Sequence, residues 1–256
     1  MHLSDIHFGV ENADAVAAAR DYALGEGVDA LIFTGDITQS GRRREFAAAR
    51  DWMQQLPEPR VSTPGNHDTP YFDLASRLLW PWARYDAFIR RAALEGCDIG
   101  EVQVVTINTA RGAQPRINWS KGQIRARDAQ WACEAMAGAG TALRIVGCHH
   151  PLTEVTGGPM TGRVWGGRRA CSILAEGKVD LILTGHVHMP FAHALPCGDG
   201  KTYSVGAGTL SLRERGSPAG FNLIEADPAE VRITSMGWTG SHFEPQRTWG
   251  FERRGA

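Results

Sequence analysis

The amino-acid sequence predicts an α/β fold in which helices cover parallel or mixed β-sheets, and three observations lead to this prediction. Short apolar runs that are typical of buried strands alternate with helical segments over most of the chain. Most of these strands end in a polar loop, and glycines stand where three of the loops must turn sharply, at Gly35, Gly65 and Gly185. Near the C-terminus, strand-like runs follow one another in the manner of antiparallel strands.

The N-terminal part of the chain follows this alternation element by element. The segment before Asp5 is short for a strand, so either the first strand is clipped or the sequence given begins late. A helix is expected over 12–25, with Asn12 or Asp14 as its N-cap and an alanine-rich body. The next expected elements are a strand over 30–33, a helix over 44–55 and a strand over 60–63.

Residues 69–96 break the alternation, because they are helical in character and rich in aromatic side chains. The aromatic residues include Trp80, Trp82, Tyr85 and Phe88. We expect this segment to be an insertion, at about 69–100, that forms a cap over a functional site. The alternative is that each aromatic ring only covers an edge of the core.

The rest of the chain returns to the earlier pattern. A loop over 153–167 contains five glycines, which favours a mobile segment close to a ligand. Helices are expected over 121–137 and 170–176. Strands are expected over 102–108, 143–148, 180–184, 203–206, 220–225 and 231–235.

The length is compatible with one large domain or two small ones, and we expect one domain that spans 1–256. The chain has 43% apolar and 21% charged residues and a formal net charge of -1, which gives no general drive toward nucleic acid or an anionic membrane. No apolar run is long enough to span a membrane and no secretion signal is evident, so we expect a cytoplasmic protein. The five cysteines form no CxxC pair and are expected to be free and buried.

Side chains that can bind metals follow five of the expected strands. His186 and His188 leave one strand end two residues apart, so both imidazoles can reach one point beyond it. A single Asp after a strand is usually a helix cap, and a single His is usually a hydrogen-bonded polar residue. Jointly, the strand ends carry a set that indicates a metal centre: Asp5, His7, Asp36, Asn66, His67, His149, His186 and His188.

These residues stand in blocks that resemble those of the calcineurin-like binuclear metallophosphoesterases. The family pattern is DxH, GD, GNH(D/E), a His before x-P, and GHxH. All five blocks occur here in order, as Asp5-Ile6-His7, Gly35-Asp36, Gly65-Asn66-His67-Asp68, His149-His150-Pro151 and Gly185-His186-Val187-His188. The stretches 35–41 and 206–209 further resemble the branch that includes bacterial class III cyclic nucleotide phosphodiesterases. The resemblance implies a four-layer αββα sandwich of two mixed β-sheets flanked by helices.

The resemblance also implies roles for the residues of the site. Asp36 would bridge two divalent or trivalent transition metal ions, and Mn, Fe, Zn and Co all suit mixed nitrogen and oxygen ligands. A hydroxide between the ions would attack phosphorus. His67 would act as the general acid, with Asp68 accepting a hydrogen bond from its other ring nitrogen, and a purely structural role is the alternative for His67. The remaining ligands would be Asp5, His7 and His188 for one ion, and Asn66, His149 and His186 for the other.

Three further residues are candidates for contacts with a phosphate, namely His150, Arg111 and Arg163. A packing role for His150 and a solvated surface position for each arginine are the alternatives.

The predicted function is hydrolysis of a small phosphodiester, either a cyclic nucleotide or another diester. A phosphomonoesterase or nucleotide pyrophosphatase could use the same metal core, whereas a non-catalytic scaffold of this fold would lack ligands that are present here. A nuclease would need a basic track, and the cluster over 42–44 is more typical of a solvated helix start, so nucleic acid is not an expected partner. The sequence leaves open the natural substrate, the metal identity and whether the chain forms a homo-oligomer.

Overall fold

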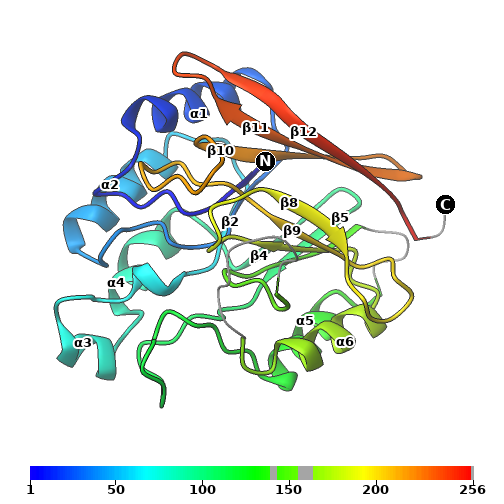
Figure 1. Ribbon diagram of the computed structural model, residues 1–256, viewed down its shortest axis with the longest axis horizontal. Coiled ribbons are helices and arrows are strands. Elements are labelled where there is room, and N and C mark those ends of the chain that lie inside the picture. Colours follow the sequence, from blue (N-terminus) through cyan, green and yellow to red (C-terminus); the bar gives the residue numbers. More distant parts are fainter. Residues whose placement is uncertain (139–142, 155–163, 255–256) are drawn as a thin grey trace.

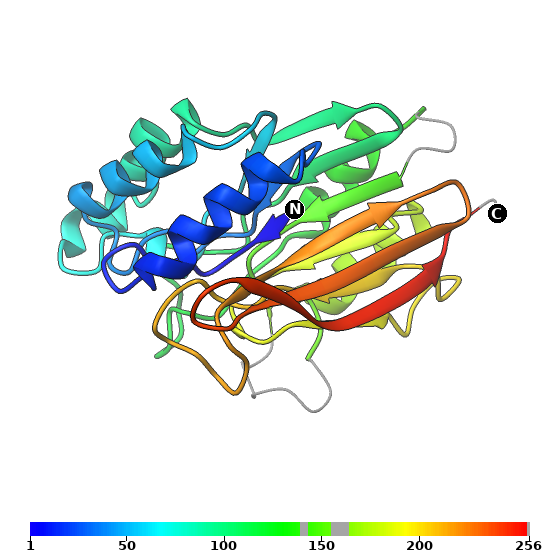
Figure 2. The same ribbon diagram turned by 90° about the horizontal axis from the view of Figure 1, so that it is seen from above.

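The computed structural model describes residues 1–138, 143–154 and 164–254, and most of the expected glycine loop lies outside them. Two six-stranded β-sheets pack face to face, and helices cover the outer faces (Figure 1, Figure 2). This architecture confirms the predicted four-layer αββα sandwich of two mixed sheets. No helix in the described ranges is long and apolar enough to cross a membrane.

The first sheet has the strand order β12-β11-β10-β1-β2-β3. Strands β1, β2 and β3 are parallel to one another, and the other three continue the sheet in antiparallel fashion. The short first strand is paired on both sides, because His2 lies opposite Ile32 and also opposite Asn222. The strand bounds are β1 His2–Leu3, β2 Leu31–Phe33, β3 Arg60–Ser62, β10 Gly220–Ala226, β11 Glu230–Trp238 and β12 Phe243–Glu252.

The second sheet has the strand order β4-β5-β6-β7-β9-β8. Its four central strands are parallel, and the two edge strands are antiparallel to their neighbours. The strand bounds are β4 Gly96–Ile99, β5 Val102–Thr106, β6 Leu143–Gly147, β7 Leu181–Thr184, β8 Phe191–Ala194 and β9 Tyr203–Gly206.

Four helices form the outer layers, and three apolar clusters fill the spaces between the layers. The helices are α1 Ala13–Gly25 and α2 Arg43–Met53 on the first sheet, and α5 Ala126–Ala135 and α6 Gly167–Glu176 on the second. Strand β2 shows how alternation builds the layers, since Leu31 and Phe33 pack with the first pair of helices while Ile32 packs between the sheets. As predicted, Asn12 caps α1 by accepting a hydrogen bond from Ala15 N at 3.2 Å.

The segment between β3 and β4 consists of short helical pieces. These are the 3-10 turn η1 Asn66–Asp68, the helices α3 Leu74–Leu79 and α4 Ala83–Phe88, and the 3-10 turn η2 Ile89–Arg91. Its aromatic residues have different environments. Tyr85 is fully buried, with its hydroxyl 2.7 Å from Ser62 Oγ, whereas Trp80 is 64% exposed.

The structure differs from the prediction in the start of one helix, in several strands and in the burial of the cysteines. The helix expected from residue 121 begins at Ala126, because Gln123 pairs with Trp165 and Gly122 lies against the ring of His150. Strands β4, β8 and β12 were not predicted, and β12 is an edge strand of mostly exposed residues in which partly buried apolar side chains alternate only near its end, at Trp249 and Phe251. All five cysteines are free, but only two of them are buried and the other three are partly exposed.

Candidate metal centre

The carboxyl ends of parallel strands from both sheets meet at one edge of the sandwich. Within the first sheet, Asp5 N donates a hydrogen bond to Gly35 O at 3.0 Å. Within the second, Gly185 N donates to His149 O at 2.9 Å. The two sheets are joined where His186 N donates to Asp5 Oδ2 at 2.8 Å. Residues from distant parts of the chain therefore share one small volume.

One cluster in this volume contains Asp5, His7 and His188, all of them buried. The Nε2 atom of His188 lies 3.1 Å from Asp5 Oδ1 and 3.2 Å from His7 Nε2. His7 Nε2 in turn lies 3.7 Å from Asp5 Oδ1. Two nitrogen ligands at about 2.0–2.1 Å from one tetrahedral ion are about 3.3 Å apart. The spacing of the two imidazoles therefore suits a shared ion.

Asp36 connects this cluster to a second group of histidines. Its Oδ2 atom lies 3.9 Å from His7 Nε2 and 3.2 Å from His149 Nε2. The ring centroid of His186 is 5.2 Å from that of His149. Possible ligand atoms of His149, His150 and His186 lie within 4.8 Å of one another. The carboxylate of Asp36 thus stands between the two groups.

The backbone at the centre adopts a conformation that residues other than glycine rarely adopt. Six non-glycine residues of the described ranges have positive φ angles, and five of them belong to the centre: Asp5 at 54°, His7 at 53°, Asp36 at 50°, His186 at 69° and His188 at 58°. Each such residue costs about 1–3 kcal/mol and persists only where the surrounding structure holds it. Strain of this kind is typical of functional sites.

Two glycines allow the loops to approach the carboxylates closely. A Cβ atom on Gly65 would collide with the side chain of Asp36, and one on Gly185 would collide with Ser4 and Asp5. A residue with a side chain would therefore not fit at these two positions of the sequence blocks.

Backbone carbonyls fix the orientation of two of the imidazoles. His149 Nδ1 lies 2.7 Å from Thr34 O, and His188 Nδ1 lies 2.8 Å from Arg213 O. Because a carbonyl oxygen can only accept, each Nδ1 must carry a hydrogen, and Nε2 is the ring nitrogen that faces the cluster. This arrangement is common among histidines that bind metals.

The two carboxylates favour positive charge in this buried space. Asp5 and Asp36 are fully buried, and their ion pairs in the described ranges are with histidines. Burial alone would raise the pKa of Asp36, but the charges of His149 and His67 bring it below its usual range. Burial alone would lower the pKa of His149, but the carboxylate of Asp36 raises it to about 9. Burial and the charge of His149 lower the pKa of His186 to about 3, so this imidazole is neutral.

Two polar atoms at the centre, His7 Nδ1 and Asn66 Oδ1, are buried without a hydrogen-bond partner among the residues described. Two others, Asp5 Oδ1 and His149 Nε2, have only the ion-pair contacts given above. Leaving a buried polar group unpaired costs about 1–3 kcal/mol, so native structures rarely contain such groups together at one place. These oxygen and nitrogen donors fit transition metal ions such as Mn, Fe, Zn or Co.

His67 is partly buried beside the centre, and its ring is held in a way that differs from the prediction. Its Nδ1 atom lies 2.7 Å from Gln39 O. The prediction that Asp68 orients the His67 ring is wrong. The Asp68 carboxylate is fully buried and accepts hydrogen bonds from Thr38 N at 2.8 Å, Thr38 Oγ1 at 2.9 Å and Gly65 N at 2.9 Å. Asp68 thereby stabilises the loops after β2 and β3.

Arg213 belongs to the site, although the sequence analysis did not identify it. Its Nη1 atom lies 3.3 Å from His67 Nε2 and 3.3 Å from Gln39 Oε1. Its carbonyl accepts the hydrogen bond from His188 described above. The neighbouring stretch 206–209 was a signal for this region, but it indicated only a branch of the family and no role for the arginine.

A cavity of about 610 Å³ opens beside His67. Arg77 is buried at this cavity, where its Nε donates to Gly112 O at 2.8 Å. Its guanidinium carbon lies 5.4 Å from the ring centroid of Trp119 and 5.9 Å from that of Tyr71. The cavity therefore combines a cation and two aromatic faces. Its lining residues are Asn66, His67, Tyr71, Leu74, Arg77, Ile117, Asn118, Trp119 and Ser120.

His150 does not offer a free ring nitrogen for the predicted contact with substrate. The residue is buried, its Nδ1 lies 2.9 Å from Thr109 Oγ1, and its Nε2 lies 2.8 Å from Ser120 O. Its ring centroid is 4.6 Å from that of His186. The structure therefore supports the alternative role, in which His150 packs against a candidate ligand.

Two arginines, Arg111 and Arg163, were predicted to contact a phosphate. Arg111 lines a different pocket from the one beside His67, and its Nη1 donates to Asn108 O at 2.9 Å. The loop after β5 turns the Arg111 side chain toward that other pocket, so Arg111 is not placed to contact a phosphate in the cavity beside His67. Arg163 lies outside the described residues.

Comparison with known proteins agrees with this arrangement. The chain is 26% identical over 215 residues to a probable cyclic nucleotide phosphodiesterase of Synechococcus sp., with 82% of this chain and 76% of that protein covered. It is also 26% identical over 257 positions to a cAMP/cGMP dual specificity phosphodiesterase of Mycobacterium tuberculosis, with 90% and 76% covered. These names support the predicted resemblance to the cyclic nucleotide phosphodiesterase branch.

A solved structure and a family model extend the comparison. The purple acid phosphatase PPD1 of yellow lupin superposes with a TM-score of 0.62 at 12% identity, over 98% of this chain and 53% of that one, which shows a shared fold. The model of the calcineurin-like phosphoesterases matches residues 1–190, well over half of the sequence. The chain therefore belongs to the calcineurin-like phosphoesterase family.

Proposed function

We propose that this chain is a metal-dependent hydrolase of small phosphodiesters and that the cluster around Asp36 is its active site. The position of Asp36 carries the proposal, because its carboxylate lies between His7 and His149 in a buried space. Nitrogen atoms of His7 and His149 that can bind a metal face it. The relatives that are named as phosphodiesterases support the choice of a diester.

The chain would hold two metal ions through ligands that meet at Asp36. When bound, such ions polarise phosphate oxygens and lower the pKa of water. The carbonyl groups that fix His149 and His188 keep the donor atoms in place, so binding requires little reorganisation. The ligands would be Asp5, His7 and His188 on one side of Asp36, and Asn66, His149 and His186 on the other.

His67 would give a proton to the leaving oxygen. Its Nδ1 is engaged with Gln39 O, so Nε2 is the atom that can exchange a proton with a substrate. Arg213 lies 3.3 Å from this Nε2 and restricts how the ring can turn. The guanidinium group also offers further N–H donors to a phosphate oxygen.

The cavity beside His67 would receive the organic part of the diester. Tyr71 and Trp119 provide faces against which a planar group can stack, and Arg77 supplies a positive charge close to both rings. A cyclic nucleotide has both a planar base and an anionic diester, so it matches this lining.

The test combines metal analysis with a panel of substrates. The panel contains bis-p-nitrophenyl phosphate, p-nitrophenyl phosphate, 3′,5′-cAMP and 2′,3′-cAMP. We expect purified protein to carry transition metal ions, to hydrolyse diesters faster than the monoester, and to lose activity with EDTA and regain it with Mn²⁺ or Zn²⁺.

Two other results would each contradict a specific part of the proposal. Faster hydrolysis of p-nitrophenyl phosphate would replace the diesterase with a phosphomonoesterase on the same metal core. Metal-loaded protein that hydrolyses none of the four compounds would instead favour a binding scaffold of this fold.

A further inference from the structure

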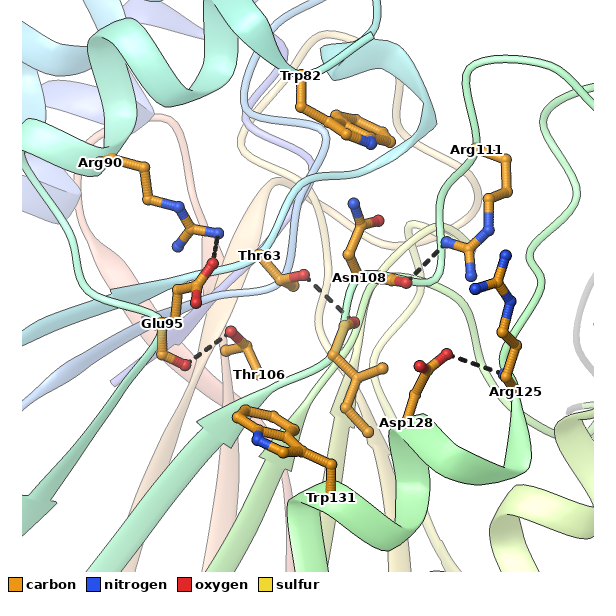
Figure 3. A pocket seen from close by; sticks show the side chains of 11 residues that line it. Thr63, Trp82, Arg90, Glu95, Thr106, Asn108, Arg111, Arg125, Asp128 and Trp131 are labelled. Atoms are coloured by element: carbon orange, nitrogen blue, oxygen red, sulfur yellow. Dashed lines mark hydrogen bonds and ion pairs between the residues drawn. The ribbon is translucent and has the colours of Figure 1, made fainter. Parts of the chain in front are cut away.

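A second pocket, of about 460 Å³, is drawn in Figure 3. Its lining contains no candidate metal ligand and shares no residue with the cavity beside His67. The loop after β5 separates the two sites, since Asn108 and Arg111 line this pocket whereas Thr109 contacts His150. A molecule bound here would therefore occupy a site distinct from the catalytic one.

Two arginines give one side of the pocket a positive charge. Figure 3 shows the guanidinium groups of Arg111 and Arg125 next to each other. Arg111 Nη1 donates to Asn108 O at 2.9 Å and to Ala110 O at 2.6 Å, which fixes the group while its other N–H donors remain available. Burial lowers the pKa of Arg111, and the charge of Arg125 lowers it further against the opposing effect of Asp128.

The Arg125 side chain has no hydrogen bond or ion pair within the described ranges, and its interaction with Asp128 is through its backbone N–H at 3.0 Å. That carboxylate is also 3.8 Å from Arg127 Nε, on the exposed surface of α5. The printed ion pair of Asp128 is therefore with Arg127 and not with the guanidinium group of Arg111 or Arg125. An anion placed between them would gain charged hydrogen bonds from both arginines.

The other walls of the pocket consist of aromatic rings and of an arginine whose charge is already paired. Trp82 and Trp131 lie on opposite sides of the pocket in Figure 3, and their rings come from the start of α4 and from α5. Trp131 is 49% exposed, which is high for an indole that has no ligand against it. The third arginine, Arg90, is engaged by Glu95 and so adds no free charge.

We propose that this pocket binds a nucleoside monophosphate, with the phosphate between Arg111 and Arg125 and the base against the tryptophan rings. The two charged donors match a phosphate dianion, and the indole faces match a planar base. A volume of about 460 Å³ is within the usual range of small-molecule sites, about 300–1,000 Å³. The proposal does not depend on catalysis at the metal centre.

The test is calorimetric titration of metal-loaded protein with AMP, inorganic phosphate and adenosine. We expect AMP to bind at a site that Arg125→Met weakens at least tenfold, and Arg111→Met combined with Arg125→Met weakens further. Arg44→Met is the matched control, because it removes the same charge at an exposed position of α2 outside the pocket lining, and it should leave AMP affinity unchanged. Trp131→Leu should weaken AMP binding without changing the response to inorganic phosphate.

Arg125→Met should keep the circular dichroism spectrum and hydrolytic activity of the unmodified chain, because the arginine side chain makes no described contact that holds the fold. AMP binding that is indifferent to Arg125→Met would overturn the proposal. An equal loss with Arg44→Met would also overturn it, since this would show general electrostatic attraction. Affinity for inorganic phosphate as high as that for AMP would exclude the assigned role of the tryptophans.

Discussion

The Nη1 atom of Arg213 lies 3.3 Å from the Nε2 atom of His67, although the two residues are 146 positions apart in the sequence. Arg213 belongs to the loop between β9 and β10, and its carbonyl also accepts a hydrogen bond from His188. One residue therefore contacts both the proposed proton donor and a proposed metal ligand. The region after the last sequence block contributes directly to the site.

A double-mutant cycle tests whether Arg213 acts through His67. We expect Arg213→Met to lower kcat about tenfold in the unmodified chain but to have little further effect after His67→Ala, because residues that act as a unit are not additive. Arg213→Lys should restore only part of the loss, since its ammonium group ends a stem of different shape and does not place a donor where Nη1 contacts both Gln39 and His67. The kcat, KM and metal content are measured for each protein, with Arg215→Met as the control. Additive losses would show that the two residues act independently.

The effect of His67→Ala should depend on the leaving group. With 3′,5′-cAMP, whose leaving group is an alkoxide, we expect kcat to fall by about 10²- to 10⁴-fold, the usual range for losing a general acid. With bis-p-nitrophenyl phosphate the loss should be much smaller, because p-nitrophenolate leaves without a proton. Metal content should stay constant, and His242→Ala at an exposed position is the control. The general-acid role would be rejected by equal losses on both substrates, or by loss of the metals.

Asp36→Asn should remove metal and activity together. An amide has one acceptor oxygen and no charge, so it cannot replace a carboxylate that lies between two groups of ligands. We expect fewer metal ions per chain by mass spectrometric analysis and hydrolysis at least about 100-fold slower, because bound ions contribute several kcal/mol to such reactions. The exposed Asp51→Asn, which removes an equivalent charge from a surface pair with Arg50, should change neither quantity. Full metal content in Asp36→Asn would contradict the bridging role.

The sequence could predict those parts of the site in which a short motif stands directly after a recognisable strand. Asp5 and His7, or His186 and His188, directly follow a strand, and parallel strands bring their carboxyl ends to one edge. The layered fold could be predicted for the same reason, since buried strands and amphipathic helices show their periods locally. Each of these inferences needs only a few neighbouring residues.

The parts that the sequence could not predict depend on contacts across the fold. Asp68 follows His67 directly, but its carboxylate accepts hydrogen bonds from the backbone amides of Thr38 and Gly65. The start of α5 is displaced because Gly122 must lie against the ring of His150, which comes from another strand. Arg213 and the arginines of the second pocket likewise have no local pattern that marks them.

Arg254, at the C-terminal end of the described chain, makes hydrogen bonds with residues next to the strands of the second sheet. Its Nη1 donates to Val179 O and to Asp180 Oδ1, both at 2.8 Å. Its Nε and Nη2 donate to the two carboxylate oxygens of Asp199 at 3.0 Å and 2.9 Å. Such charged hydrogen bonds contribute about 1.5–3 kcal/mol each in buried settings and less where water reaches them. We expect Arg254→Met to lower the free energy of unfolding by about 1–3 kcal/mol in urea denaturation at pH 7.

The contribution of Asp199 should vary with pH in a defined direction. Its hydrogen bond from Arg254 lowers the pKa of the carboxyl below its usual value, which is about 3.9 in an unfolded chain. A group whose pKa is lower in the folded state stabilises the fold above the unfolded pKa, and this stabilisation is lost as the pH falls below it. The difference in unfolding free energy between the unmodified chain and Asp199→Asn should therefore be largest near pH 7 and shrink as the pH falls below about 4. Asp21→Asn, at an exposed pair with Arg20, should show no comparable change, and a difference that stays constant from pH 7 to pH 3 would refute the assignment.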